Sequence, residues 1–172
     1  MGKVHNSKSH KDLTWDYSDP VNGQSIPAPF FYDADIFEQE KEHIFMKCWH
    51  LVGHVNELKE PGTFIVQDVF EQSVIIITEK DGNIHAWHNV CRHRGNRLMN
   101  ERRGKVGGML RCPYHSWCYN LDGSLRAAPR TEHLDNFCKK DHSLRKVRME
   151  IFAGWVFITL DDDAQAVSEM AA

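Results

Sequence analysis

Two short Cys-His pairs constrain the fold of this chain more than any other feature. Residues 91–93 read C-R-H and residues 112–115 read C-P-Y-H, with eighteen residues between the pairs. Both pairs adjoin strand-like sequence, and Gly95 and Pro113 favour sharp turns beside them. Each pair is therefore expected in a loop at the tip of a hairpin. Two such tips facing each other would make a four-ligand site from Cys91, His93, Cys112 and His115.

The spacing of these ligands bears on which metal they bind. Thiolates and imidazoles suit both zinc and iron-sulfur centres. Structural zinc sites usually separate the first two ligands by two to four residues, whereas a single residue separates Cys91 from His93. Two mixed pairs suit a two-iron cluster, in which two sulfurs hold one iron and two imidazoles the other. The pattern favours a [2Fe-2S] cluster, and a structural zinc-binding domain stays as the alternative.

The surrounding sequence predicts an all-β fold of antiparallel strands. The runs TFIVQDV and SVIIITE are rich in β-branched residues, and KDGN at 80–83 is typical of a hairpin turn. IHAWHNV then alternates, and SWCYN, LDGS and KVRMEIFAGWVFITL predict further strands and turns. We expect a β domain over residues 51–160 with two ligand-bearing hairpin loops.

The two ends of the chain read differently from this domain. Residues 1–50 predict an N-terminal arm that contains one helix at 35–49, with Asp35 and Glu38 able to cap its start. Residues 161–172 form a polar tail that is expected to be disordered.

Composition narrows the classes of protein. The 172 residues are 41% hydrophobic and 26% charged, which suits one globular domain. A net charge of -3 gives no reason to expect nucleic acid or an anionic membrane as a partner. The chain has no apolar run of membrane-spanning length and its polar N-terminus does not resemble a signal peptide, so we expect a cytoplasmic location. There, the five cysteines are expected to be metal ligands or thiols before disulfides.

The Cys-His pairs and their flanks resemble a known family. CRHRG followed by CPYHSW is similar to the Rieske [2Fe-2S] motif. FYDADIFEQEKEHIFMKCWHLVGH, PGTF, DGNIHAWHNVCRHRG, CPYHSWCYNLDGSL and GWVFITL resemble, in this order, the Rieske domain of ring-hydroxylating oxygenase large (alpha) subunits. The resemblance implies that Cys91 and Cys112 bind one iron and that His93 and His115 bind the other. Ser116 departs from the family, which usually has Gly there.

The resemblance also implies a function and partners. The function is one-electron transfer, with a ferredoxin or a flavin reductase as the donor and a mononuclear iron oxygenase domain or subunit as the acceptor. The His93 or His115 edge would face that acceptor, across a subunit boundary, and a homo-oligomer is compatible with this. Respiratory Rieske proteins carry two further cysteines where this chain has Asn96 and Tyr114, which favours the lower-potential oxygenase type.

The second half of such an oxygenase has no counterpart in these residues. Its mononuclear iron needs two histidines and a carboxylate, and no histidine follows His142. We therefore expect a fragment or one half of a split oxygenase that does not oxygenate substrate by itself, with an independent Rieske ferredoxin as the alternative. PAPFFYDADIFEQEKEHIF also resembles oxygenases that act on quaternary ammonium compounds such as carnitine or betaine.

Other histidines are interpreted as structural. His50, His54 and Glu57 would need a helix to converge on a metal, and Gly53 favours a strand or turn there. His85 and His88 lie on opposite faces of one predicted strand. We interpret them as one surface and one core histidine.

Two further features have a functional and a structural interpretation. The basic run RRGK at 102–105 is either a docking site for an acidic electron donor or, as we favour, a solvated hairpin. Trp87, Trp117 and Trp155 are expected in the core, and Trp117 is also placed to shield the cluster from water.

Overall fold

The computed structural model describes residues 25–131 and 133–171, and these form two compact units that divide between Lys47 and Cys48. Each unit is described by itself. Within the first unit the structure gives the following helical elements: η3, a 3-10 helix (Ala28–Phe31), α1 (Ala34–Glu40) and η4, a π-helical turn (Lys41–Phe45). The part of the predicted arm at residues 1–24 lies outside the described residues.

The helix is shorter than the sequence indicated, and its cap is a different residue. The carboxylate of Asp33 accepts hydrogen bonds from the backbone N–H groups of Asp35 (2.9 Å) and Ile36 (3.3 Å). Asp33 is therefore the N-cap, not Asp35 with Glu38. The helical segment ends at Phe45, and His50 already belongs to a strand.

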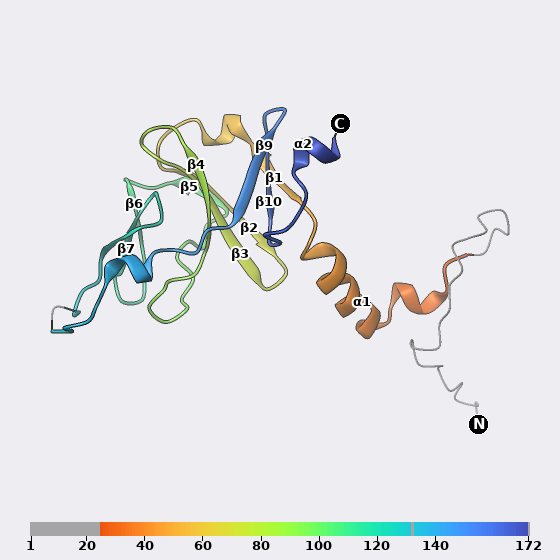
Figure 1. Ribbon diagram of the computed structural model, residues 1–172, viewed down its shortest axis with the longest axis horizontal. Coiled ribbons are helices and arrows are strands. Elements are labelled where there is room, and N and C mark those ends of the chain that lie inside the picture. Colours follow the sequence, from red (N-terminus) through yellow and green to blue (C-terminus); the bar gives the residue numbers. More distant parts are fainter. Residues whose placement is uncertain (1–24, 132, 172) are drawn as a thin grey trace, which may run out of the picture. The chain divides into compact units, whose positions relative to one another are not determined.

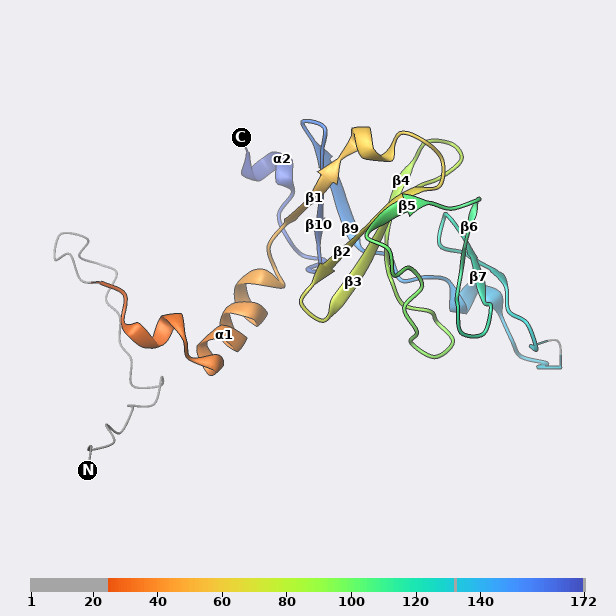
Figure 2. The same cartoon turned by 180° about the vertical axis from the view of Figure 1, so that it is seen from behind.

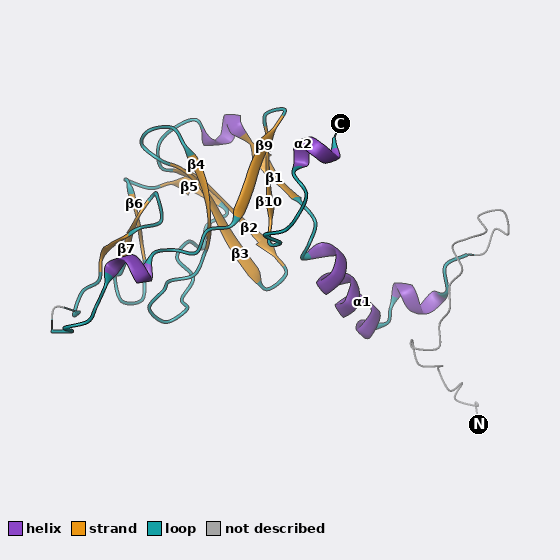
Figure 3. Cartoon of the chain, in the orientation of Figure 1, coloured by secondary structure: helices purple, strands orange, loops and turns teal. Residues whose placement is uncertain are grey.

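The second unit is built from three antiparallel sheets, which confirms the predicted all-β class (Figure 3). The strands are β1 (His50–His54), β2 (Thr63–Val69), β3 (Gln72–Thr78), β4 (Ile84–His88), β5 (Arg103–Lys105), β6 (Met109–Arg111), β7 (Cys118–Asn120), β8 (Leu125–Ala127), β9 (Arg148–Phe152) and β10 (Trp155–Thr159). Their sheet orders are β1-β10-β9, β4-β3-β2-β5 and β6-β7-β8. In views from both sides the four-stranded sheet lies between the other two (Figures 1 and 2). Short 3-10 helices join strands at η5 (Val55–Leu58) and η6 (Lys139–His142).

The four-stranded sheet follows the sequence pattern closely. β2 and β3 pair from Phe64 with Ile77 to Val69 with Gln72, and β3 pairs with β4 across the KDGN turn. Gly82 in that turn has φ of +89°, the left-handed conformation that glycine tolerates best. All four residues from Val74 to Ile77 are fully buried, because this central strand packs on both faces.

A single apolar cluster joins this sheet to the β6-β7-β8 sheet. It contains Ile75, Trp87, Leu110 and Tyr119, and the two cysteines of the predicted site belong to it. The Trp87 indole N–H donates to the carbonyl of Leu121 (3.0 Å), which ties β4 to the turn after β7. The site is thus assembled where the two sheets share a core.

Two expectations about the C-terminal third differ from the structure. Trp155 was expected in the core but is 46% exposed, because it lies on the outer face of β10. Residues 161–171, expected to be disordered, carry the short helix α2 (Val167–Met170). The backbone N–H of Val167 donates to the Glu150 carboxylate (2.8 Å), and the indole of Trp49 donates to the carbonyl of Gln165 (2.8 Å). These contacts hold the tail against the β1-β10-β9 sheet.

Candidate metal centre

The two predicted ligand loops share one backbone hydrogen-bond pattern. In the first loop the N–H of Cys91 donates to the carbonyl of Asn96 (2.8 Å), and the N–H of Gly95 donates back to the carbonyl of Cys91 (3.0 Å). In the second loop the N–H of Cys112 donates to the carbonyl of Trp117 (2.8 Å), and the N–H of Ser116 donates to the carbonyl of Cys112 (3.1 Å). Each loop therefore presents its cysteine and its histidine from the same kind of turn.

Gly95 and Ser116 occupy equivalent places in these turns. Both have a left-handed backbone, with φ of +70° at Gly95 and +60° at Ser116. A residue with a Cβ is strained in this conformation by about 1–2 kcal/mol. The hydroxyl of Ser116 accepts a hydrogen bond from Arg111 (2.9 Å), which gives that side chain a partner. The serine is therefore tolerated where a glycine would fit without strain.

The sulfur side of the site faces the core. Cys91 and Cys112 are each 2% exposed, and burial raises the pKa of the Cys91 thiol. The hydroxyl of Tyr119 lies 3.3 Å from the sulfur of Cys91 and accepts a hydrogen bond from the N–H of Arg92 (2.9 Å). Burial, and then the contact with Cys91, raise the pKa of Tyr119, so this phenol keeps its proton. To a Cys91 thiolate, which has no proton of its own, this hydroxyl would be the donor.

The imidazole side of the site faces outward. The rings of His93 and His115 lie with centroids 4.7 Å apart, at 73° to each other. His93 is exposed and stacks on buried Trp117 (4.9 Å, 10°), while Tyr114 lies against His115 (3.8 Å). Although His93 is exposed, partial desolvation of its ring, and then the nearby charges of His115 and Arg94, lower its pKa. A lowered pKa favours the neutral imidazole, which is the form that binds metal.

A surface cleft of about 720 Å³ opens over these imidazoles. Besides the two histidines, residues from both loops and from the segment after β8 line it. Phe137 and His142 also line it, with their ring centroids 4.6 Å apart at a tilt of 31°. The imidazoles are therefore the part of the site that a partner can approach.

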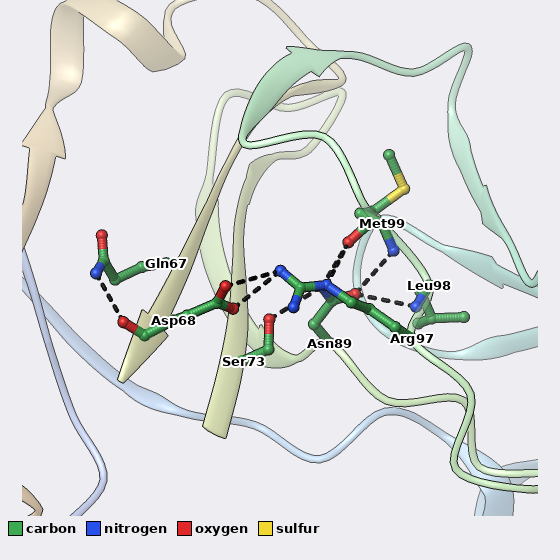
Figure 4. A network of polar contacts seen from close by, with 7 residues as sticks. All are labelled: Gln67, Asp68, Ser73, Asn89, Arg97, Leu98 and Met99. Atoms are coloured by element: carbon green, nitrogen blue, oxygen red, sulfur yellow. Dashed lines mark hydrogen bonds and ion pairs between the residues drawn. The ribbon is translucent and has the colours of Figure 1, made fainter. Parts of the chain in front are cut away.

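Asn89 holds the segment that follows the first loop (Figure 4). Its side-chain oxygen accepts from the N–H groups of Leu98 (3.1 Å) and Met99 (2.9 Å), and its amide donates to the carbonyl of Met99 (2.7 Å) and the hydroxyl of Ser73 (3.1 Å). Asn89 is completely buried, so each of these bonds satisfies a group that has no access to water. Arg97 extends the network by donating to the Asp68 carboxylate (2.9 and 3.1 Å).

The donor set fits a two-iron cluster. Over residues 25–131 and 133–171, no three His, Cys, Asp or Glu side chains converge on one metal-sized point. A two-iron cluster asks for only two protein ligands at each iron, because bridging sulfides complete each iron's coordination. Here two buried sulfurs lie on one side and two adjacent imidazoles on the other.

Comparison with known proteins bears on this geometry directly. Residues 48–138 match the family model of the Rieske [2Fe-2S] domain. This chain belongs to the Rieske [2Fe-2S] domain family. Membership implies a [2Fe-2S] cluster as the cofactor and agrees with the resemblance of the motif CRHRG and CPYHSW.

The relatives of this Rieske domain are oxygenase subunits. This chain is 38% identical over 152 residues to the carnitine monooxygenase oxygenase subunit of Acinetobacter pittii (strain PHEA-2), a match that covers 88% of this chain and 41% of that protein. It is 37% identical over 148 residues to the glycine betaine monooxygenase oxygenase subunit of Pseudomonas aeruginosa (strain UCBPP-PA14), covering 86% and 34%. The chain therefore spans about two fifths or less of the length of these relatives.

Solved structures that resemble this chain are also Rieske oxygenases. The apo form of the quaternary ammonium Rieske monooxygenase CntA superposes with a TM-score of 0.80 at 38% identity, over 86% of this chain and 43% of that one. Naphthalene 1,2-dioxygenase from Rhodococcus sp. superposes with a TM-score of 0.79 at 30% identity, over 84% and 33%. The Rieske fold of this chain is thus the oxygenase type.

Two side chains of the basic run that the sequence singled out have acidic partners. In the basic run, Arg103 pairs with Glu57 (2.8 Å) and Lys105 with Glu60 (2.7 Å), which favours the solvated hairpin. His50 and His54 lie in strand β1, as the sequence indicated.

The interpretation of the β4 histidines was partly wrong. His85 and His88 are both half-buried, where one core and one surface residue were expected. His85 lies 2.9 Å from Glu79. Burial, and then the charge of Arg145, lower the pKa of His88.

Sequence reasoning missed Tyr119 and Asn89 at the site. Tyr119 is the second residue of β7, the strand that leaves the second loop, and Asn89 precedes the first ligand by two residues. The available signal was a polar group two residues after a tryptophan expected in the core, Trp87 for Asn89 and Trp117 for Tyr119. Such a residue has to find a partner inside the core.

The described residues contain no helix with the length and apolar character needed to cross a bilayer.

Proposed function

We propose that this chain is an electron-transfer module that handles one electron at a time, as the electron-accepting part of a Rieske oxygenase. The [2Fe-2S] cluster, when bound, supplies the one-electron redox chemistry. Cys91 and Cys112 would hold one iron from the core side, and His93 and His115 would hold the other from the surface side. The domain would span residues 51–160, preceded by the arm at 1–50.

The observation that carries this proposal is the division of the site into a buried and an exposed half. Cys91 and Cys112 are sealed in the apolar cluster together with Tyr119, which excludes water from the sulfurs. His93 is exposed beside His115 at the floor of the cleft. Electrons would therefore pass between this protein and its partners at the imidazole edge.

The relatives support a choice of partners. The relatives are oxygenase subunits, and one solved relative is described in terms of inter-subunit electron transfer. We infer that a ferredoxin or a flavin reductase is the donor, and that a mononuclear iron domain or subunit is the acceptor. In that arrangement His93 and His115 face the acceptor across a subunit boundary.

The substrate class of the complete system is inferred from the same relatives. Two groups of relatives act on carnitine and on glycine betaine, both quaternary ammonium compounds. We propose a quaternary ammonium substrate for the oxygenase to which this domain contributes. We place the choice of substrate in the mononuclear iron domain.

A redox titration combined with substrate assays tests the proposal. The cluster-loaded chain should take up one electron, with a midpoint potential of roughly -150 mV, the low end of the Rieske range. It should oxidise neither carnitine nor glycine betaine until a mononuclear iron domain is added. His115→Ala should then abolish turnover, and Tyr114→Phe, in the neighbouring position, should not. Turnover by the isolated chain, or a strongly positive potential, would contradict the assignment.

A further inference from the structure

A second, smaller pocket lies beside the first ligand loop. It has a volume of about 190 Å³, and its lining residues come from β3, β4, the first loop and the segment before β9: Gln72, His88, Val90, Arg92 and Arg145. No acidic residue lines it. Arg92 stands between Cys91 and His93 in the sequence and also lines the large cleft, so the pocket adjoins the metal centre.

Both arginines of this pocket lack a partner within the part of the chain that the structure describes. The Nε of Arg92 is buried and makes no hydrogen bond. The Arg145 side chain, which is exposed, makes no hydrogen bond or ion pair with a described residue. Arg97 is paired with Asp68 and Arg103 with Glu57, whereas the exposed Arg126 also has no side-chain partner among the described residues, so the buried Nε of Arg92 is the informative group. A buried donor without an acceptor usually marks a missing water, ion or ligand.

The charges around the pocket favour an anion. The two guanidinium groups of Arg92 and Arg145 stay positive at any physiological pH. His88 faces Arg145, and the charge of Arg145 helps to lower its pKa. The carboxylate of Asp162 acts on His88 in the opposite direction, and it is the negative group that opposes an incoming anion. Two cations against one exposed carboxylate leave a net positive pocket.

We propose that this pocket binds one oxyanion, a carboxylate or a phosphate, held by Arg92 and Arg145. Guanidinium groups bind such anions through paired hydrogen bonds, and Gln72 adds an amide donor. The anion comes either from solution or from an acidic side chain of a docked protein. The proposal rests on the proposed function in one respect: a negative charge beside the cluster opposes the added electron, so binding should lower the midpoint potential.

A phosphate titration of the cluster-loaded protein tests the site. Ionic strength is held constant with sodium chloride, so that screening does not change. The wild-type potential should fall with phosphate and then level off, and isothermal titration calorimetry should give a matching dissociation constant. Arg145→Gln should weaken binding about tenfold or more, since it removes a charge-assisted contact. Arg126→Gln, an exposed arginine outside the pocket, should bind phosphate as the wild type does.

A second arm identifies the source of the anion. Calorimetry with an acidic plant-type [2Fe-2S] ferredoxin measures docking in the wild type and in both variants. A protein carboxylate predicts that Arg145→Gln weakens ferredoxin binding selectively and that phosphate competes with ferredoxin. The proposal is overturned if phosphate and ferredoxin bind Arg145→Gln and the wild type equally, or if neither binds the wild type. The visible spectrum of the cluster is recorded throughout. A spectrum that shows no intact, reducible cluster would mean that the proposed function has failed, separately from the anion site.

Discussion

Replacing Tyr119 with phenylalanine should lower the potential of the cluster. The phenol oxygen lies 3.3 Å from the sulfur of Cys91 and already accepts a hydrogen bond from the N–H of Arg92. An iron-bound thiolate has no proton, so the hydroxyl must donate to it. This hydrogen bond strengthens as the sulfur gains negative charge, and it therefore stabilises the reduced form.

The size of the effect follows from the kind of hydrogen bond. A bond to a charged group contributes about 1.5–3 kcal/mol. The sulfur carries charge in both oxidation states, so we take about 1 kcal/mol as the part that depends on the added electron. At about 59 mV per tenfold change for one electron, Tyr119→Phe should lower the potential by about 40 mV. It should also lower the free energy of unfolding by about 1–3 kcal/mol, because the buried N–H of Arg92 loses its acceptor.

The assay is a redox titration followed by the visible or circular dichroism spectrum of the cluster. Tyr114→Phe is the matched control, since Tyr114 belongs to the second loop but is 60% exposed. Its potential should stay near that of the wild type. A Tyr119→Phe protein with a full cluster and an unchanged potential would refute the argument from the hydroxyl.

Three further predictions concern stability, each measured by urea denaturation of the cluster-loaded protein. Ser116→Gly should raise the free energy of unfolding by about 1 kcal/mol, because glycine relieves the strain of a left-handed backbone. Gly95→Ser should lower it by about 1–2 kcal/mol for the same reason. Changes of the same sign would contradict the equivalence of these two positions in their loops. Asn89→Ala should lower it by about 2–4 kcal/mol and reduce iron content, because two buried N–H groups lose their acceptor; Asn96→Ala, whose side chain bonds only locally, should cost much less. The pKa of His88 is lower in the folded chain than in the unfolded chain, so as the pH falls the unfolded chain takes up the proton at a higher pH. The free energy of unfolding should therefore decrease as the pH falls below about 6.5. His88→Asn should weaken this dependence on pH.

The parts of the fold that the sequence predicted are those set by local pattern. The β-branched runs at β2 and β3, the glycine turn before β4 and the two Cys-His loops each depend on residues close together in the chain. Their physical causes, backbone strain and alternation of apolar side chains, are visible in a window of a few residues. These features were enough to indicate the four-ligand site.

The parts that could not be predicted depend on pairing between distant residues. The helix was drawn too long because His50 pairs with Ile158 in the β1-β10 ladder, far along the chain. Trp155 was placed in the core because the pattern of β10 does not say which face its neighbours cover. Tyr119 reaches Cys91 only once two sheets have packed together, and the tail is ordered through Glu150. In each case the deciding contact is tertiary.

Metal and sulfide analysis of the purified protein tests the central claim most directly. If Cys91, His93, Cys112 and His115 hold a Rieske cluster, each chain should contain about two irons and two acid-labile sulfides, with negligible zinc. Replacing any one of these four residues with alanine should remove most of the iron, and Cys118→Ala, outside the set, should retain it. One zinc per chain without sulfide would contradict the account and leave a structural zinc domain.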